Sequence, residues 1–210
     1  MKKILLTVLA GFLGWTVSHA TVTSVPTWNY SGGIYCYQPV LSTDGSGNQS
    51  VTLDGSQWSS WGTMGLDILT DTASDPTLTI NNNLNNESTF VWTQYIVNVA
   101  MNQTFTIGNA VVNLPSGWAA AVTQPTLQSG SYVGTIDYYV MPGGTPVAIY
   151  PAPDSAFDYS YQITFSGSTS YSFTESATAV PEPGSPGFVM AGGLLIGISL
   201  ALKRARAVSA

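Results

Sequence analysis

Carboxylates are the side chains in the central part of the sequence that could perform acid–base chemistry. Residues 21–179 hold ten of them and contain no Lys, Arg or His. A pair of carboxylates is all that glycoside hydrolysis requires. Asp137 and Asp158 are the best candidates, but both occupy polar positions of alternating patterns that any β-sheet protein shows. A carboxylate-pair glycosidase is therefore a remote alternative, and no catalytic residue is assigned.

The missing basic residues exclude several classes of function. All five Lys and Arg residues lie in the first three or the last eight positions, and the one His is His19. A nucleophile activated by histidine cannot form in residues 21–179, and a zinc site of the usual His and Cys ligands cannot form either. Nucleic-acid binding is excluded as well, because nothing there could neutralise phosphates.

Two groups of residues with side-chain oxygens could hold a cation. Asp44, Ser46 and Asn48 place oxygen ligands at alternate positions, as calcium loops do, but the full twelve-residue pattern is absent. A glycine-rich hairpin turn is the better interpretation. The spacing of Asp67, Asp71 and Asp75 could gather carboxylates on a helix, yet the β-favouring neighbours predict a turn-rich loop. We expect no cofactor, with calcium as the alternative.

Tryptophans in polar surroundings are the other candidates for a site. Trp58 and Trp61 lie in a Ser-rich stretch, and Trp118 follows Pro115-Ser116-Gly117. An exposed indole can stack on a sugar ring through its apolar face. The alternative is that these three rings cap a hydrophobic core.

The central region alternates aromatic and β-branched residues with Ser, Thr, Asn and Gly, a pattern typical of β-strands and turns. We therefore expect strands to position the candidate residues. The clearest pattern is 156–165, where five apolar residues alternate with Asp158, Ser160, Gln162 and Thr164. A long central strand is expected near 89–100, strands around a turn at Gly108-Asn109, and a loop at 81–86. The prediction is one all-β domain, an antiparallel β-sandwich that is jelly-roll-like or Ig-like.

One cysteine, Cys36, lies in this region, so no internal disulfide can form. A buried strand thiol is the plain interpretation. An intermolecular disulfide is the alternative.

The two ends of the chain carry targeting signals. Lys2 and Lys3, an apolar run to Val17, and small residues at Ser18 and Ala20 have the form of a secretory signal peptide. Signal peptidase is expected to cleave after Ala20, so residues 1–20 form a signal helix and 21–179 the mature domain.

Residues 180–210 begin with Val180, Pro181, Glu182 and Pro183. An uncharged run, 188–202, follows and is short for a membrane span, and Lys203, Arg204 and Arg206 would keep the tail cytoplasmic.

This order of motif, short span and basic tail resembles the PEP-CTERM sorting signal of Gram-negative bacteria that make exopolysaccharide. The resemblance covers residues 180–206 and implies recognition by an exosortase, a membrane transpeptidase that cuts near Pro181-Glu182-Pro183. On that basis the protein is expected to be exported, held transiently in the inner membrane, and released to the cell surface or matrix. A permanent C-terminal anchor is the alternative.

A sorting signal does not identify what the mature domain does. The expected function is a non-catalytic surface or extracellular-matrix protein associated with exopolysaccharide or biofilm. The alternative is a carbohydrate-binding module that uses aromatic residues.

Overall fold

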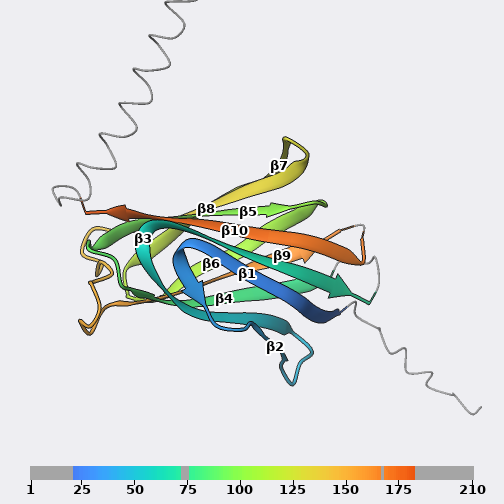
Figure 1. Ribbon diagram of the computed structural model, residues 1–210, viewed down its shortest axis with the longest axis horizontal. Coiled ribbons are helices and arrows are strands. Elements are labelled where there is room, and N and C mark those ends of the chain that lie inside the picture. Colours follow the sequence, from blue (N-terminus) through green and yellow to red (C-terminus); the bar gives the residue numbers. More distant parts are fainter. Residues whose placement is uncertain (1–20, 72–75, 167, 183–210) are drawn as a thin grey trace, which may run out of the picture.

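The computed structural model of the chain describes residues 21–71, 76–166 and 168–182, and within them every regular element is a β-strand (Figure 1). The all-β prediction is therefore confirmed. The predicted signal helix, transmembrane helix and basic tail lie outside the described residues. The strands are β1 Val22–Cys36, β2 Val40–Thr43, β3 Gln49–Thr70, β4 Thr77–Asn86, β5 Trp92–Met101, β6 Phe105–Leu114, β7 Trp118–Gln128, β8 Ser131–Val140, β9 Ala156–Phe165 and β10 Ser170–Pro181.

The ten strands belong to one sheet with the main order β6-β9-β4-β3-β10-β5-β8-β7. The long strand β3 joins its two halves: residues 49–57 pair with β4, and residues 61–69 pair with β10. β1 and β2 lie along the remaining edge of β3. The pairing of β3 with β4 is parallel, so the sheet is mixed and the predicted antiparallel sandwich is not confirmed.

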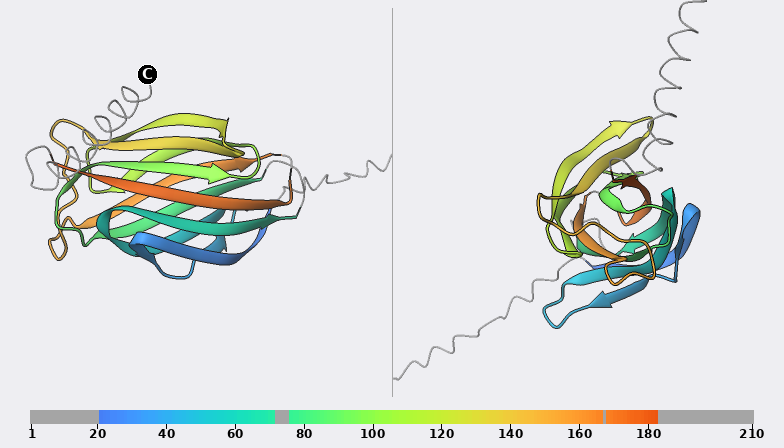
Figure 2. Two further views of the ribbon diagram at one scale, coloured as in Figure 1. Left: turned by 45° about the horizontal axis from the view of Figure 1, so that its top comes forward. Right: turned by 90° about the vertical axis from the view of Figure 1, so that its left-hand side faces the viewer.

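The sheet curls until its outer strands β6 and β7 approach each other, as both views in Figure 2 show. The side chain of Gln124 bridges this seam, because its amide accepts a hydrogen bond from Ile107 N at 3.0 Å and donates one to Ile107 O at 2.7 Å. The Gln124 side chain thus makes the pair of hydrogen bonds that a backbone peptide group of a neighbouring strand would make, at the point where β7 has a bulge. The result is a nearly closed sheet with a single interior.

Alternation decides which side chains fill that interior. In β9 the predicted pattern is confirmed: Phe157, Tyr159, Tyr161, Ile163 and Phe165 are all buried. They meet inward residues of β5, β8 and β10 across the interior, and the ring of Phe157 packs against those of Tyr95 and Tyr138.

A carboxylate lies within this core. Glu175 of β10 is 0% exposed and accepts hydrogen bonds from the hydroxyls of Tyr159 (2.6 Å) and Tyr161, and from Asn82 Nδ2 at 3.4 Å. Burial raises the pKa of Glu175, and the three hydrogen bonds oppose that effect. Residues 21–182 contain no Lys, Arg or His that could pair with this carboxylate.

Three local predictions are wrong. Residues 81–86 are not a loop but the second half of β4. Gly108 and Asn109 do not end a strand, because β6 continues through them with a bulge at which Asn109 has a φ of 47°. Asp67, expected in a turn-rich loop, lies in β3, which runs to Thr70.

The predicted sorting motif begins inside the sheet. Val180 and Pro181 are the last residues of β10, where they pair with Gln94 and Trp92 of β5. Glu182 N then donates to Val91 O at 3.1 Å. The described domain therefore runs past residue 179 and includes the first residues of the motif, while Pro183 lies outside the described residues.

Candidate functional site

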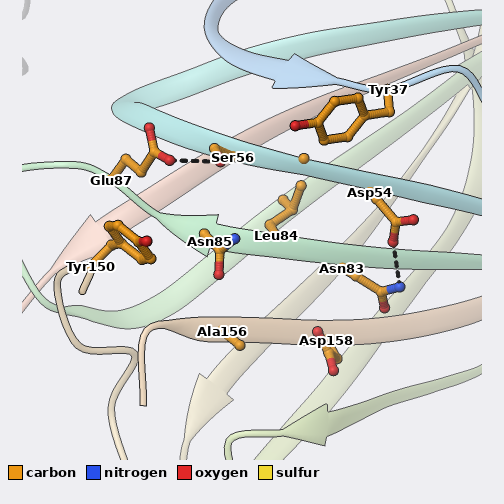
Figure 3. A pocket seen from close by; sticks show the side chains of 11 residues that line it. Tyr37, Asp54, Ser56, Asn83, Leu84, Asn85, Glu87, Tyr150, Ala156 and Asp158 are labelled. Atoms are coloured by element: carbon orange, nitrogen blue, oxygen red, sulfur yellow. Dashed lines mark hydrogen bonds between the residues drawn. The ribbon is translucent and has the colours of Figure 1, made fainter. Parts of the chain in front are cut away.

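A groove lies on the outer face of the sheet, over β3, β4 and β9 (Figure 3). Its volume is about 360 Å³. Its floor is made by outward side chains of the three strands, and its walls come from the segments that follow β1, β4 and β8. The lining residues are Tyr37, Asp54, Gly55, Ser56, Asn83, Leu84, Asn85, Glu87, Tyr150, Ala156 and Asp158.

The floor consists of two rows that run across the strands. In one row Asp54, Asn83 and Asp158 are register partners, and Asn83 Nδ2 donates to Asp54 Oδ1 at 2.7 Å. In the other row Ser56, Asn85 and Ala156 are partners. Because the alternate residues of β4 point into the core, its asparagines at 83 and 85 must point outward. The small side chain of Ala156 leaves the second row hollow.

Two tyrosines and one glutamate form the walls. Tyr37 is 61% exposed and Tyr150 is 56% exposed, and each stands at one end of the groove in Figure 3. Their backbones are fixed, since Tyr37 N donates to Asp54 O and Tyr150 N donates to Asn86 O, both at 2.8 Å. Glu87 accepts a hydrogen bond from Ser56 Oγ at 2.9 Å. Exposed rings on a fixed backbone are well placed to stack on a ligand.

The electrostatics of the groove disfavour anions. It contains three carboxylates, and residues 21–182 include no Lys, Arg or His. Partial burial raises the pKa of Asp158, and the nearby Asp54 raises it further. The remaining polar side chains carry amides and hydroxyls, which can both donate and accept. Such a lining suits a neutral ligand rich in hydroxyl groups.

The two carboxylates predicted as a glycosidase pair are not brought together. Asp158 lies in the groove on β9, whereas Asp137 lies on β8, which pairs only with β5 and β7 among the described strands. Asp137 accepts a hydrogen bond from Gln94 Nε2 at 2.8 Å. The carboxylate that shares a row with Asp158 is Asp54.

The three predicted tryptophans divide into two kinds. Trp58 and Trp61 are exposed, at the kink between the two halves of β3. Trp118 is 8% exposed, packs against Phe157, and donates from Nε1 to Thr145 O at 2.8 Å. Trp118 thus belongs to the core, where it has no free face for a sugar.

The Asp44 segment is a turn between β2 and β3, as expected. Asp44 Oδ1 accepts from the backbone N–H groups of Ser46 and Asn48, and Oδ2 accepts from Asn48 Nδ2. These hydrogen bonds, above all the one from the Asn48 side chain, lower the pKa of Asp44. In the part of the chain that the structure describes, no three acidic, His or Cys residues cluster to hold a metal. The calcium alternative remains a prediction.

Cys36 is a buried free thiol at the end of β1, beside the Met64 thioether. Desolvation, with smaller contributions from Glu175 and Asp54, raises its pKa to about 12. The plain interpretation of a buried strand thiol therefore fits its position.

The described part of the chain includes no helix of the length and hydrophobicity that a membrane crossing requires. Comparison with protein-family models, with curated proteins and with solved structures gave no match. The resemblance of residues 180–206 to a sorting signal therefore stays a prediction.

Sequence reasoning missed most of the groove. Of its lining it singled out only Asp158, because Asn83 and Asn85 were assigned to a loop and Tyr37 and Tyr150 lie outside strands. One signal could have found it: Leu84 is the one apolar residue in the asparagine run, and it marks the positions of β4 that point into the core.

Proposed function

We propose that the mature domain is a non-catalytic surface or extracellular-matrix protein that binds neutral polysaccharide through the groove. The observation that carries this proposal is the pairing of two exposed tyrosines with a floor of Asp, Asn and Ser side chains. Aromatic faces stack on the apolar face of a sugar ring, and amides and carboxylates accept and donate hydrogen bonds to its hydroxyls. The lack of basic groups favours neutral over acidic sugars.

Affinity electrophoresis of residues 21–182 against cellulose-type glucan, starch, mannan, xylan and dextran tests this proposal. We expect retardation by at least one polymer. Replacing Tyr37 or Tyr150 by alanine should then weaken binding about two- to twelvefold, from roughly 0.5–1.5 kcal/mol per lost aromatic contact. Tyr139→Ala is the matched control, because Tyr139 is an exposed tyrosine of β8, away from the groove. No retardation by any polymer, or equal losses in all three variants, contradicts the proposal.

Delivery of the domain by an exosortase-type system is the second part of the proposal. Its support is the order of motif, short apolar run and basic tail in residues 180–206. Since Pro181 is paired and buried in β10, a cut in the folded protein would have to fall after it. Mass spectrometry of the mature C-terminus from producing cells tests this part. A terminus shortly after Pro181 is expected, and an intact Ala210 in the membrane fraction would instead indicate a permanent anchor.

Glycoside hydrolysis has one observation in its favour, the row that holds Asp54 and Asp158. Both are register partners of Asn83, so they lie two strand spacings apart, about 10 Å between Cα atoms. Inverting glycosidases hold their two carboxyl groups about 6.5–9.5 Å apart. An assay of reducing-sugar release separates the two functions. For a binding protein we expect no release, and Asp158→Asn should keep most of the affinity. Release that Asp158→Asn abolishes would assign an enzyme.

A further inference from the structure

Four aromatic rings form a continuous ladder on β1 and the residue after it. The ring centroids of Trp28 and Tyr30 are 5.5 Å apart, those of Tyr30 and Tyr35 are 5.1 Å apart, and those of Tyr35 and Tyr37 are 5.1 Å apart. Each ring is partly or largely exposed. Trp28 is partly buried against the hydrophobic core, and the rings of Tyr30 and Tyr37 are the most exposed of the four, so the ladder is an aromatic feature of the surface.

The ladder leads directly into the groove. Tyr35 is the register partner of Ser56, so it extends the row of Ser56 and Asn85 by one strand. Tyr37, the last ring of the ladder, is bonded to Asp54 through its backbone and also forms a wall of the groove. The ladder and the groove are thus one surface that crosses β1, β3, β4 and β9.

A fifth ring widens the ladder at its centre. A Cβ atom at Gly32 would lie 2.6 Å from the ring of Trp61, and Gly32 has a φ of 73°, which favours glycine. The glycine therefore lets the indole lie directly against β1, between the positions of Tyr30 and Tyr35 in the sequence. Trp61 is itself exposed, so this close approach adds aromatic surface without burying it.

We propose that the ladder and the groove together bind one extended, unbranched segment of neutral polysaccharide, several sugar units long. This inference rests on the proposed function and names the form of its ligand. A single sugar would fill the groove alone and leave the ladder uncovered. A polymer continues past Tyr37 along the rings, where stacking needs no charged partner. The absence of Lys, Arg and His from residues 21–182 again favours a neutral chain.

The probe is a series of oligosaccharides of increasing length, made by partial hydrolysis of the polymer that retards the domain. Affinity measured by calorimetry should rise at least tenfold from the shortest to the longest member. Tyr30→Ala should weaken the long oligosaccharides severalfold and leave the short ones unchanged, whereas Tyr37→Ala should weaken both. Tyr30→Phe, which keeps the ring, should behave as the wild type.

The outcomes separate this inference from the proposed function. Binding that is independent of length and of Tyr30 overturns the ladder inference and leaves the groove proposal intact. No binding by any member overturns both. If the exposed rings instead bury themselves against a second copy of the chain, light scattering will show a dimer that Tyr30→Ala dissociates, and the ladder inference is wrong.

A second inference comes from the start of the domain. Thr21 N donates to Asp71 Oδ1 at 2.9 Å and Thr21 Oγ1 donates to Asp71 Oδ2 at 2.8 Å, while Asp71 N donates to Thr21 O at 3.0 Å. One aspartate at the end of β3 thus holds the nitrogen, the hydroxyl and the carbonyl of Thr21. The contact fixes the start of β1, because Val22 is already the register partner of Thr70.

This nitrogen changes character if the predicted signal cleavage occurs after Ala20. It becomes an α-ammonium with an ordinary pKa of about 7.7–8.0, and it is then the one basic group between residues 21 and 182. We infer that maturation creates an ion pair between the Thr21 ammonium and the Asp71 carboxylate, which locks β1 onto β3. Among the residues that the structure describes, the others that line the hollow beside Thr21 are uncharged, and Asp71 is the titratable group bonded to the Thr21 nitrogen.

Protein that begins at Thr21 is compared with the same protein acetylated at its N-terminus. The free amine should give the higher melting temperature near pH 6. An ammonium that gains a carboxylate has a raised pKa, so its contribution is complete below about pH 7.7 and is lost as the pH rises through the folded value. The two melting temperatures should therefore converge above about pH 9.5. Asp71→Asn should remove the difference at pH 6.

Equal melting temperatures of the free and acetylated proteins at every pH overturn the ion pair. A mature N-terminus other than Thr21, measured by mass spectrometry of the exported protein, overturns the role of maturation. Thr21→Val keeps the amine and removes the hydroxyl, so it should retain the pH-dependent difference. That variant separates the ion pair from the hydroxyl contact.

Discussion

Above the ordinary pH range of a carboxyl group, the E175Q variant should be more stable than the wild type, and the difference should grow as the pH rises. Glu175 is fully buried, and its hydrogen-bond donors, Tyr159, Tyr161 and Asn82, are neutral. Burial raises the pKa of Glu175, so the folded protein holds a proton there that the unfolded chain releases above about pH 4.3. Glutamine has nearly the shape of the protonated side chain and does not titrate.

The size of the effect follows from linkage. One proton held by the folded state alone changes the free energy of unfolding by about 1.4 kcal/mol per pH unit. Stability due to Glu175 is complete below the unfolded pKa and is lost as the pH rises toward the folded pKa. As the pH rises above the unfolded pKa, the wild type should therefore lose up to about 1.4 kcal/mol per pH unit until the folded pKa is reached, and E175Q should lose much less. Asp44 has a lowered pKa, so its contribution changes below this window.

Urea titrations of both proteins at several pH values measure this difference. Asp158 also has a raised pKa, so the comparison is made between wild type and E175Q, which share Asp158. Parallel pH profiles of the two proteins would refute the reasoning, because they would mean that Glu175 is equally ionised when folded and unfolded. Tyr161→Phe removes one donor from the carboxyl and should cost about 1–3 kcal/mol in the wild type but less in E175Q.

Three further predictions concern residues of the strands and turns of the domain. Cys36, whose pKa is about 12, should not react with a thiol reagent at pH 8 in the native protein and should react fully in denaturant. Gly55→Ala should destabilise the fold by several kcal/mol in denaturation experiments, because its Cβ would lie 2.0 Å from Tyr35 O, whereas Gly108→Ala, which has open space, should be nearly neutral. Asp44→Ala should lower the denaturation midpoint at neutral pH, and the loss should shrink as the pH falls and the carboxyl takes up a proton, because the hydrogen bonds that lower the pKa of Asp44 stabilise its ionised form.

The sequence predicted those strands whose two faces differ in chemistry. In β9 aromatic residues alternate with Asp, Ser and Gln, so period and burial agree and its bounds are correct. The second half of β4 is predicted as a loop because asparagine favours turns in general. Here Asn82 and Asn86 point inward and find partners in the core: Asn82 donates to Glu175, and Asn86 donates to the backbone of Phe90 and Val147. The contacts with Glu175 and Val147 join residues far apart in the sequence, so no local sequence pattern predicts them.

Topology and the site were harder to foresee for the same reason. Alternation indicates which face of a strand is buried, but it does not indicate which strands pair. The parallel pairing of β3 with β4 therefore could not be predicted from it. The groove combines residues from three strands and three connecting segments. Asp158 is a candidate from the sequence alone because it is a carboxylate in the clear alternating pattern of 156–165. Tyr37 and Tyr150 resemble any surface tyrosine until the fold places them at the two ends of the groove.

The central place of β10 in the sheet bears on how the domain withstands force. β10 is antiparallel to β3 on one edge and to β5 on the other, and its last residue, Pro181, is buried. A domain tethered through the residues after Pro181 would be pulled along the axis of this strand. Such a load acts in shear on two ladders at once, so their rungs must break together and cannot peel apart one by one. Rupture under tension is governed by the unfolding rate, so we expect two ladders loaded together to slow the unfolding of a domain held at this end.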